Sequence, residues 1–321
     1  MTMLRWGVLG AANIARKAVI PAIHASSNGE VVAIAARERS RAEALAQEIN
    51  IPEVLDDYTA LINSPNVDAV YIPLPNSEHY RWTIAAAEAG KHILCEKPLA
   101  LNAQQAEEMA QAADRAGVKL SEAFMYRHHP IVKDVLDLIH GGAIGKLRVV
   151  RSTFSFSLSN DENIRLSKEL GGGALMDVGC YGVSLARLVT GEEPSAVTAI
   201  SIEGPSGVDE LFIGAMRFES GVVAEIDVSI RAAGETRYEL IGSTGRIYVR
   251  HGFKLAPDEE GEIQIEQQGE VSRIFTEPVN QYQLMVEEFG RAVLENRPLR
   301  FPAEDGVAQM RVIDALFKAA V

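Results

Sequence analysis

Apolar positions in the first 120 residues fall into short runs, rich in β-branched residues, that alternate with longer amphipathic stretches. The apolar runs lie at residues 4–9, 31–35, 69–72, 92–95 and 118–121. The amphipathic stretches lie at residues 40–49, 58–63, 77–89 and 103–116. Strands that are apolar on both faces and alternate with helices form parallel sheets covered on both sides, so the pattern predicts a doubly wound α/β domain over residues 1–122. Asn102 followed by Gln105 predicts a capped helix start, and Gly117 predicts a helix end.

The pattern changes near residue 147, where apolar and polar residues alternate in RVVRSTFSFSLS. Such alternation is typical of an antiparallel strand with one exposed face. Similar runs follow a helical stretch at 174–189, and they lie at residues 196–202, 211–218, 222–230, 238–241 and 246–249. With two closing helices at 281–294 and 304–320, residues 123–321 are predicted to form an α+β domain around a large, mostly antiparallel open sheet.

The composition, with 47% hydrophobic and 23% charged residues, is that of a globular protein. A net charge of −13 argues against a nucleic-acid partner, because binding to a phosphate backbone needs clustered Lys and Arg. No apolar run approaches the ~20 residues that cross a bilayer, and the N-terminus lacks a secretory signal pattern. Cys95 and Cys180 provide neither a disulfide framework nor metal-ligand spacing. We therefore expect a cytoplasmic protein with no metal, no nucleic acid and no membrane partner.

The first apolar run ends in GVLGAANIARKAV, which partly matches the dinucleotide fingerprint G-x-G-x-x-G. Only the tight-turn glycine, Gly10, is retained, because Ala12 and Ala15 replace the second and third glycines. A cofactor pyrophosphate would lie on the backbone N–H groups at the helix start, at Ala11, Ala12, Asn13 and Ile14. A strand-to-helix turn without a ligand is the alternative interpretation.

The second run ends in AARERSRA, where a dinucleotide-binding domain usually places an acidic residue on the ribose 2′-hydroxyl. Ala36 occupies that position here, and Arg37 and Arg41 follow. Guanidinium groups bind phosphate bidentately, so the segment predicts NADP as the preferred cofactor, with NAD possible. The alternative is a solvated basic helix start, although cations oppose the macrodipole there.

Two further strand ends carry polar residues that would reach the same crevice, because the carboxyl ends of parallel strands converge at one edge of a sheet. They contribute Pro73, Leu74, Asn76 and His79 after the fourth strand and Glu96 and Lys97 after the fifth. A lysine partly removed from water beside a cofactor can donate a hydrogen bond to a substrate oxygen. The alternatives are a surface salt bridge for Glu96 and Lys97 and a packed core histidine for His79.

Four segments together resemble the glucose–fructose oxidoreductase / inositol dehydrogenase / MocA (Gfo/Idh/MocA) family: GVLGAANIA, PNSEHYRWTIAAAEAGKHILCEKPLA, SEAFMYRHHP and GGGALMDVGCY. The resemblance covers nearly the whole chain, and within the family it is strongest to the NADP(H)-using branch of dihydrodiol dehydrogenase, xylose dehydrogenase and 1,5-anhydrofructose reductase. It implies a Rossmann domain followed by a domain whose open sheet assembles a homodimer or homotetramer. It also implies hydride transfer between nicotinamide and a sugar, polyol or alicyclic diol.

The resemblance also implies roles for single residues. Lys97 matches the lysine of the EKP signature, Tyr181 the proton donor and acceptor, and Asp177 an aspartate that faces the substrate pocket. Arg165 matches the arginine of a Trp-Arg pair near the cofactor and the substrate, and Tyr282 a tyrosine close to the nicotinamide. Two departures from the family pattern are Ala12 in the glycine turn and Ile164 in place of the tryptophan.

Residues at the domain junction give a further pair of substrate-binding candidates, Tyr126 and Arg127. With His128 and His129, Arg127 either lines the pocket or is an ordinary polar junction residue. The acidic chain offers no broad basic funnel, which favours a neutral sugar or diol over an anionic one.

Oxidation of an alcohol needs a base for the hydroxyl proton, and Tyr181 could serve if Lys97 lowers its pKa from about 10. Glycines 171 to 173 would let the backbone that carries Asp177 and Tyr181 approach the nicotinamide. The alternative function is a nucleotide-sensing regulator or scaffold on the same fold without turnover.

Overall fold

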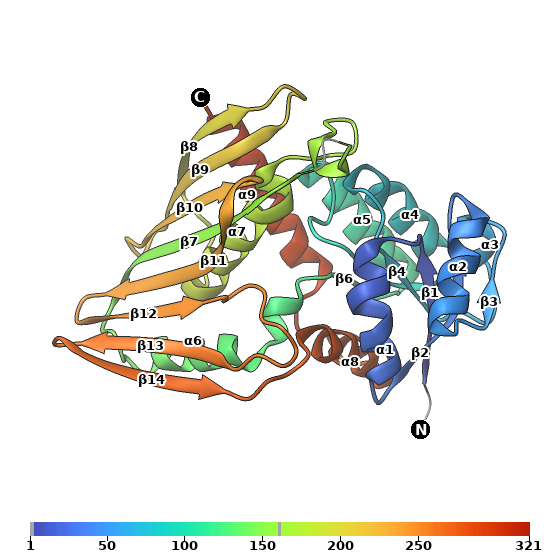
Figure 1. Cartoon of the computed structure of the whole chain (residues 1–321), viewed down its shortest axis with the longest axis horizontal. Coiled ribbons are helices and arrows are strands. Elements are labelled where there is room, and N and C mark those ends of the chain that lie inside the picture. The colour runs from blue at the N-terminus through green and yellow to red at the C-terminus, as the bar shows by residue number, and fades with distance from the viewer. Residues whose placement is uncertain (1–2, 160–161) are drawn as a thin grey trace. The chain divides into compact units, whose positions relative to one another are not determined.

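The computed structural model describes residues 3–159 and 162–321, and these form two compact units (Figure 1). The first unit comprises Met1–Met125 and Tyr282–Met310, and the second comprises Tyr126–Gln281 and Arg311–Val321. The predicted ranges 1–122 and 123–321 differ from these units in one main respect. Residues 282–310 return to the first unit, although they follow the second in the sequence.

The first unit is built on a six-stranded parallel sheet with the order β3-β2-β1-β4-β5-β6. Its strands are β1 (Leu4–Leu9), β2 (Gly29–Ala35), β3 (Glu53–Val54), β4 (Ala69–Ile72), β5 (His92–Cys95) and β6 (Leu120–Glu122). The strand order reverses between β1 and β4, which is the place where doubly wound sheets bind ligands. The predicted fold class of this half is confirmed.

The helical segments that connect these strands are the short π-helical segment η1 (Ala15–Val19), α1 (Ile20–Ala25), α2 (Arg39–Ile49), α3 (Tyr58–Ile62), α4 (Asn76–Glu88) and α5 (Ala103–Ala116). The four helices α2 to α5 agree with their predicted ranges to within two residues. Asn102 caps α5 as predicted, because its side chain accepts a hydrogen bond from the Gln105 N–H at 2.9 Å. The Gln105 side chain, however, accepts from the Leu101 N–H and not from Asn102. Gly117 ends α5 in a left-handed conformation.

Helix α8 (Gln281–Leu294) belongs to the first unit because its side chains pack against β1 and the segment before β2. The Phe289 ring lies 5.2 Å from the Trp6 ring, centroid to centroid. The Asn28 amide donates a hydrogen bond to the Glu287 carbonyl oxygen at 2.8 Å. Gly290 allows this approach, since a Cβ there would lie 2.8 Å from the Asn28 side chain.

The second unit contains an eight-stranded sheet with the order β14-β13-β12-β11-β7-β10-β9-β8. Its strands are β7 (Leu147–Ser157), β8 (Ala196–Glu203), β9 (Asp209–Arg217), β10 (Val223–Ser229), β11 (Arg231–Gly242), β12 (Gly245–Arg250), β13 (Gly261–Gln267) and β14 (Glu270–Thr276). Only the central pair β7 and β10 is parallel. The prediction of a large, mostly antiparallel sheet is confirmed.

The sequence pattern missed one α-helix and two strands of this unit: α6 (Pro130–His140), β13 and β14. Nearly every residue of β14 is exposed, so it has no buried face to produce an alternating pattern. Strand β13 does alternate, in EIQIEQ, but its neighbours are loops rich in Asp, Glu and Gly.

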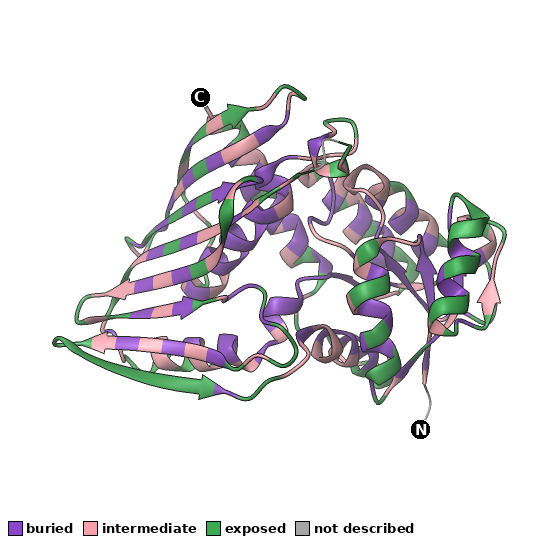
Figure 2. Ribbon diagram, in the orientation of Figure 1, coloured by how far each residue is buried: buried purple, intermediate pink, exposed green. Residues whose placement is uncertain are grey.

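One face of the large sheet is covered by helices, and the other face is open. The covering elements include α6, the π-helical segment η4 (Leu175–Gly179) with α7 (Cys180–Thr190), and the C-terminal part of α9 (Ala303–Ala319). Gly182 lets α7 lie close to the sheet, because a Cβ there would be 2.5 Å from Ser152 Oγ. Figure 2 shows buried and exposed residues alternating along these strands, as expected for a sheet with one covered face.

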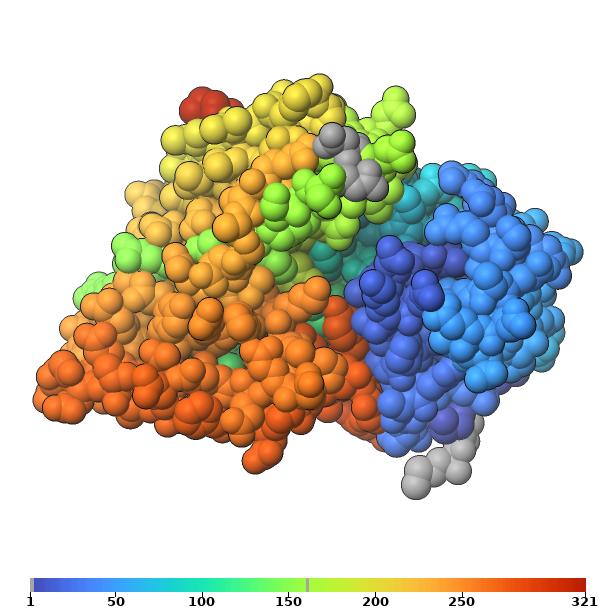
Figure 3. All heavy atoms as spheres, viewed as in Figure 1, coloured from blue at the N-terminus to red at the C-terminus, as the bar shows by residue number. Residues whose placement is uncertain are grey.

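The open face carries both charges and apolar side chains. Arg151 pairs with Glu225 at 3.0 Å, and Arg246 pairs with Glu239 at 3.3 Å. Strands β8 to β10 add exposed apolar side chains on the same face: Ile200, Ile202, Ile213 and Val223. The side chains of β8 to β14, coloured yellow to orange, form the surface seen at the left of Figure 3. Among the helices that the structure describes, none combines the length and the apolar character of a bilayer span.

Replacing Phe289 with Ala should destabilise the first unit by about 3–5 kcal/mol, because it leaves a cavity against Trp6. The chain has two tryptophans, Trp6 and Trp82, and both belong to the first unit. Tryptophan fluorescence during thermal unfolding therefore reports on that unit alone. We expect its midpoint to fall by several degrees in Phe289→Ala.

The matched control is Leu294→Ala at the end of the same helix, where the residue is 38% exposed against 1% for Phe289. It should shift the midpoint little. An unchanged tryptophan transition in Phe289→Ala would show that α8 does not stabilise the first unit.

Candidate active site

The glycine turn after β1 brings together the segments that follow three strands of the first unit. The Gly10 N–H donates a hydrogen bond to the Ala35 carbonyl oxygen at the end of β2, at 2.7 Å. Gly10 has a φ of +110°, and a Cβ there would lie 2.9 Å from Leu74 Cδ2 in the segment after β4. The helix opens directly afterwards, at Asn13, and its first N–H groups have no intrahelical acceptors. These donors and the positive end of the helix fit a pyrophosphate.

Arg37 and Arg41 lie beside this turn with their guanidinium groups available for an anion. Arg41 donates a hydrogen bond to the Ala11 carbonyl oxygen at 3.3 Å, and the Arg37 backbone N–H donates to the Tyr58 hydroxyl at 3.3 Å. Within residues 3–159 and 162–321, neither guanidinium forms an ion pair with a carboxylate. Arg39, between them, is already paired with Glu43 and Asp56. Two unpaired guanidiniums at this place fit a ribose 2′-phosphate.

His79, on the first turn of α4, connects the segments that follow β4 and β5. Its ring is fully buried, with Nδ1 2.9 Å from the Pro98 carbonyl oxygen and Nε2 2.9 Å from the Leu74 carbonyl oxygen. Burial lowers the pKa of His79, and the charge of Lys97 acts in the same direction. A neutral imidazole has one N–H and donates to one of the two carbonyls. His79 therefore holds the turn that contains Lys97 and Pro98, which are joined by a cis peptide bond.

Glu96 is surrounded by phenol groups of the first unit. It accepts a hydrogen bond from the Tyr71 hydroxyl at 2.7 Å and from the Lys97 backbone N–H at 3.3 Å. Burial and the Glu96 charge raise the pKa of Tyr71 well above its usual value, and the same two causes raise the pKa of Tyr282. Both phenols are therefore neutral near pH 7 and can donate hydrogen bonds.

Tyr181 of the second unit lies at the start of α7 in a cluster of aromatic rings. Its ring centroid is 5.2 Å from that of Phe154 and 5.7 Å from those of Tyr126 and Phe253. These contacts fix the plane of the ring, and the hydroxyl is the only polar group of the side chain. Tyr181 is 5% exposed, so its side chain is buried within this cluster.

Tyr126 and Arg127 converge on one hydroxyl of α7. The Tyr126 and Ser184 hydroxyl oxygens lie 2.6 Å apart, and Arg127 Nε donates to Ser184 Oγ at 2.8 Å. Both residues are buried. These contacts attach the short 3-10 segment η2 (Met125–His128) to the helix that carries Tyr181.

His129 is also buried, and its Nδ1 caps α6 by accepting from the Ile131 N–H. Burial lowers the pKa of His129 to about 4.

Asp177 and Arg165 form an ion pair within the second unit, with Arg165 Nε 2.6 Å from Asp177 Oδ2. Arg165 lies in the 3-10 segment η3 (Ile164–Leu166), and its backbone N–H donates to Asn163 Oδ1 at 3.1 Å. Ile164, which stands where the resemblance implies a tryptophan, is half exposed. Asp177 and Arg165 were separate candidates from the sequence, and in the structure they are direct partners.

The glycines before η4 are needed for local reasons that the sequence did not reveal. A Cβ at Gly172 would lie 2.2 Å from the Arg165 carbonyl oxygen, and a Cβ at Gly173 would lie 2.0 Å from Asp209 Oδ1. Gly173 also has a φ of +116°. These glycines thus admit a carbonyl and a carboxylate of the second unit, whereas the sequence hypothesis invoked approach to the nicotinamide. Sequence reasoning missed Asp209, Tyr71 and Ser184, since none of them lies in a recognisable motif.

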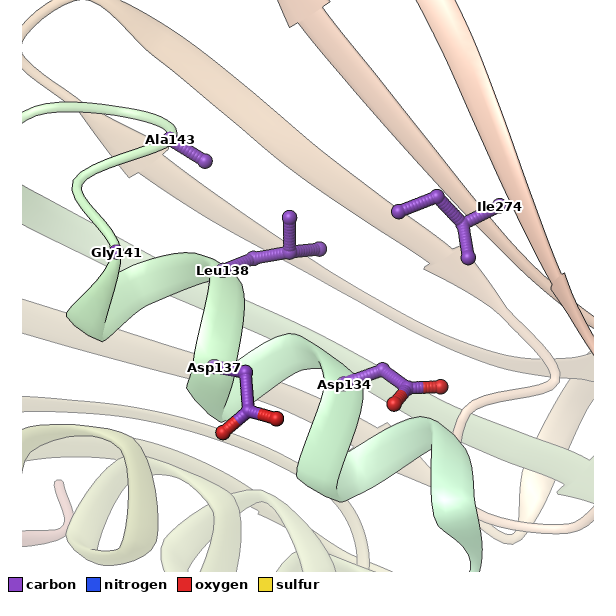
Figure 4. A pocket seen from close by; sticks show the side chains of 6 residues that line it. All are labelled: Asp134, Asp137, Leu138, Gly141, Ala143 and Ile274. Carbon is purple, nitrogen blue, oxygen red and sulfur yellow. The ribbon is translucent and has the colours of Figure 1, made fainter.

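A surface groove of about 420 Å³ lies elsewhere in the second unit, between α6 and β14 (Figure 4). Leu138 and Ile274 face each other across it, and Asp134 and Asp137 line one side. None of the candidate site residues lines this groove.

Comparison with known proteins identifies both halves of the chain. Residues 4–124 match a family model described as oxidoreductase family, NAD-binding Rossmann fold, and residues 132–248 match the GFO/IDH/MocA C-terminal domain. The chain is 39% identical to D-xylose 1-dehydrogenase (NADP(+)) 2 of Haloferax volcanii, over 99% of this chain and 97% of that protein. It is 34% identical to 1,5-anhydro-D-fructose reductase of Ensifer adhaerens, over 99% and 96%.

Among solved structures, KijD10, a 3-ketoreductase from Actinomadura kijaniata in complex with NADP and TDP-benzene, is 33% identical. It matches with a TM-score of 0.95 over 99% of this chain and 98% of that chain. KijD10 has also been solved with a tyrosine replaced by phenylalanine and with a lysine replaced by alanine. The predicted family, fold class and enzyme class are confirmed: this chain belongs to the Gfo/Idh/MocA family of oxidoreductases.

Proposed function

We propose that the protein transfers a hydride between NADP and a CH–OH carbon of a neutral sugar, polyol or alicyclic diol, as an aldose dehydrogenase or ketosugar reductase. The observation that carries the proposal is the pair of unpaired guanidiniums, Arg37 and Arg41, beside the Gly10 turn. The named activities of the relatives, on xylose and on 1,5-anhydrofructose, support this substrate class. NAD lacks the 2′-phosphate and would bind more weakly.

The residues of the first unit fit the different parts of this cofactor. The N–H groups of Ala11, Ala12, Asn13 and Ile14 would hold the pyrophosphate, and Arg37 and Arg41 the 2′-phosphate. The segments around Pro73, Leu74, Asn76 and His79, together with Glu96, Lys97 and Tyr282, would border the nicotinamide. Arg165 is the remaining cofactor-binding candidate. When bound, the nicotinamide supplies the acceptor or donor of the hydride.

In this proposal Lys97 and Tyr181 act on the same substrate oxygen. In the oxidative direction Tyr181 acts as the phenolate, which the charge of Lys97 would favour, and takes the alcohol proton; in the reductive direction the phenol gives that proton back to the substrate oxygen. The Lys97 ammonium group donates a hydrogen bond to that oxygen and stabilises its negative charge. Asp177, held by Arg165 at 2.6 Å, accepts from a neighbouring substrate hydroxyl and orients it. Tyr126 and Arg127 would line the substrate pocket from the junction segment.

An enzyme is favoured over a nucleotide-sensing regulator because the three residues that the chemistry needs, Lys97, Asp177 and Tyr181, are all present. The characterised relatives described above are also named as enzymes.

The open sheet of the second unit supports assembly into a homodimer or homotetramer. Ile200 and Ile213 are direct cross-strand neighbours, and both are about half exposed on that face. An exposed apolar patch flanked by ion pairs is typical of a protein interface.

We place the protein in the cytoplasm, where its two buried free thiols would stay reduced.

Replacing Arg37 or Arg41 with Ala should weaken NADPH binding about 10- to 100-fold, because each change removes charge-assisted hydrogen bonds worth about 1.5–3 kcal/mol. NADH binding should change little, since NADH lacks the 2′-phosphate. Fluorescence titration measures both dissociation constants without a substrate. Arg39→Ala is the matched control, because Arg39 is paired with Glu43 and Asp56. Equal losses for NADPH and NADH would argue against a 2′-phosphate site.

Tyr181→Phe should lower kcat by about 10²- to 10⁴-fold, since it removes the proton-transfer group and keeps the ring contacts. Lys97→Met should have a comparable effect. The assay follows absorbance at 340 nm with NADP and a panel of aldoses and polyols. Tyr238→Phe is the control in the same aromatic cluster, because the buried Tyr238 hydroxyl has no hydrogen-bond partner among the described residues. Near-wild-type kcat in both Tyr181→Phe and Lys97→Met would refute the assignment.

A single charge on the open sheet should disrupt the oligomer. Ile213→Asp places a carboxylate beside Ile200, and sedimentation equilibrium should then show a smaller species than the wild type. The control Ile274→Asp introduces the same charge at an exposed apolar residue of β14 that faces the α6 groove. A monomeric wild type, or an Ile213→Asp variant of unchanged mass, would exclude this interface.

A further inference from the structure

Asp209 is a buried carboxylate that accepts hydrogen bonds from the start of a helix. It is the first residue of β9 and is 6% exposed. Its Oδ2 accepts from the Leu175 backbone N–H at 2.6 Å, and the Ala174 N–H also donates to this carboxylate. Leu175 is the first residue of η4, which continues directly into α7. Asp209 thus bonds donors that the helix itself leaves without an acceptor.

Gly173 makes this contact possible. A Cβ at Gly173 would lie 2.0 Å from Asp209 Oδ1, and the φ of +116° is strained for any other residue. The Gly173 N–H donates to the Arg165 carbonyl oxygen at 2.9 Å. The backbone of residues 173–175 is therefore fixed on one side by Asp209 and on the other by the segment that carries Arg165.

We propose that Asp209 is a positioning residue, which sets the start of the η4–α7 helix and so the places of Asp177 and Tyr181. Asp177 lies two residues after Leu175, and Tyr181 lies six residues after it. Each residue of a helix is rotated by about 100° from the one before, so a first turn that shifts by one residue would turn both side chains away. The catalytic part of this inference rests on the proposed function.

The electrostatics argue that Asp209 is not retained for global stability. Burial raises the pKa of Asp209 to about 6, and the charge of Glu203 acts in the same direction, while the backbone donors Leu175, Asp209 and Ala174 oppose them. Glu203 is its neighbour on β8, and Glu210, the next residue of β9, pairs with Arg231 at 3.2 Å. Because folding raises the pKa, the protonated carboxyl group of Asp209 stabilises the folded state, and this contribution to stability is lost as the pH rises towards 6. At pH 7 the charged carboxylate therefore costs stability, yet it is the better acceptor for the two N–H groups.

The test compares Asp209→Asn with Glu203→Gln in the full-length protein. Glu203→Gln removes the neighbouring charge across the strand pair and leaves the hydrogen bonds of Asp209 in place. Hydrogen exchange of the peptide spanning residues 173–181 needs no substrate. We expect exchange to become at least several-fold faster in Asp209→Asn at pH 8 and to remain unchanged in Glu203→Gln.

Kinetics then separate positioning from a purely structural role. Asp209→Asn should lower kcat about 10-fold or more. The NADPH dissociation constant should stay within twofold of wild type, because most of the residues proposed to bind NADPH belong to the first unit. The wild-type kcat should also fall below about pH 6, as Asp209 is protonated, and this limb should be absent in Asp209→Asn.

Unchanged exchange at residues 173–181 overturns the anchoring role. Faster exchange with an unchanged kcat overturns the catalytic consequence. A wild-type protein that turns over no member of the substrate panel contradicts the proposed function, and the exchange experiment still decides whether Asp209 anchors the helix.

Discussion

The candidate cofactor site depends on the parallel pairing of β1 with β2 on one side and β4 on the other. This pairing places the carboxyl ends of β1, β2, β4 and β5 at a single edge of the sheet, so that four short loops meet there. The backbone bond from Gly10 to Ala35 and the packing of Leu74 against Gly10 are direct consequences. Arg41 then reaches the Ala11 carbonyl from the neighbouring loop. Donors that can bind an anion are thereby brought together from separate segments of the chain.

Polar side chains connect these loops, in part through hydrogen bonds to backbone groups. His79 contacts the carbonyls of Leu74 and Pro98, which come from the loops after β4 and β5. Glu96 accepts from the Lys97 N–H and from the Tyr71 hydroxyl. Such groups add little to the free energy of folding, because desolvation offsets much of each bond. They do restrict the loop that carries Lys97 to one conformation, which a catalytic ammonium group requires.

In the second unit, candidate residues are held in place by a helix and not by a set of loops. Two of its candidate residues, Asp177 and Tyr181, lie on one helix, whose start is bonded by Asp209 and whose first turns pack closely on the sheet through Gly182. Ser184 attaches the segment of Tyr126 and Arg127 to that helix. A short list of glycines and buried polar atoms therefore fixes the helix in both position and rotation, while the opposite face of the sheet remains open.

The sequence by itself determined the order and type of most elements, because hydrophobic periodicity and helix caps depend on neighbouring residues. It also located the glycine turn, Arg37, Arg41, Lys97, Asp177 and Tyr181, which lie in recognisable local patterns. Tertiary structure decided which distant residues meet: α8 with β1, His79 with Pro98, and Asp209 with Leu175, 34 residues away. No local pattern encodes such contacts, since they arise from the packing of whole elements. The glycines before η4 illustrate this: the sequence showed that they were present, and only the packed carboxylate of Asp209 explains Gly173.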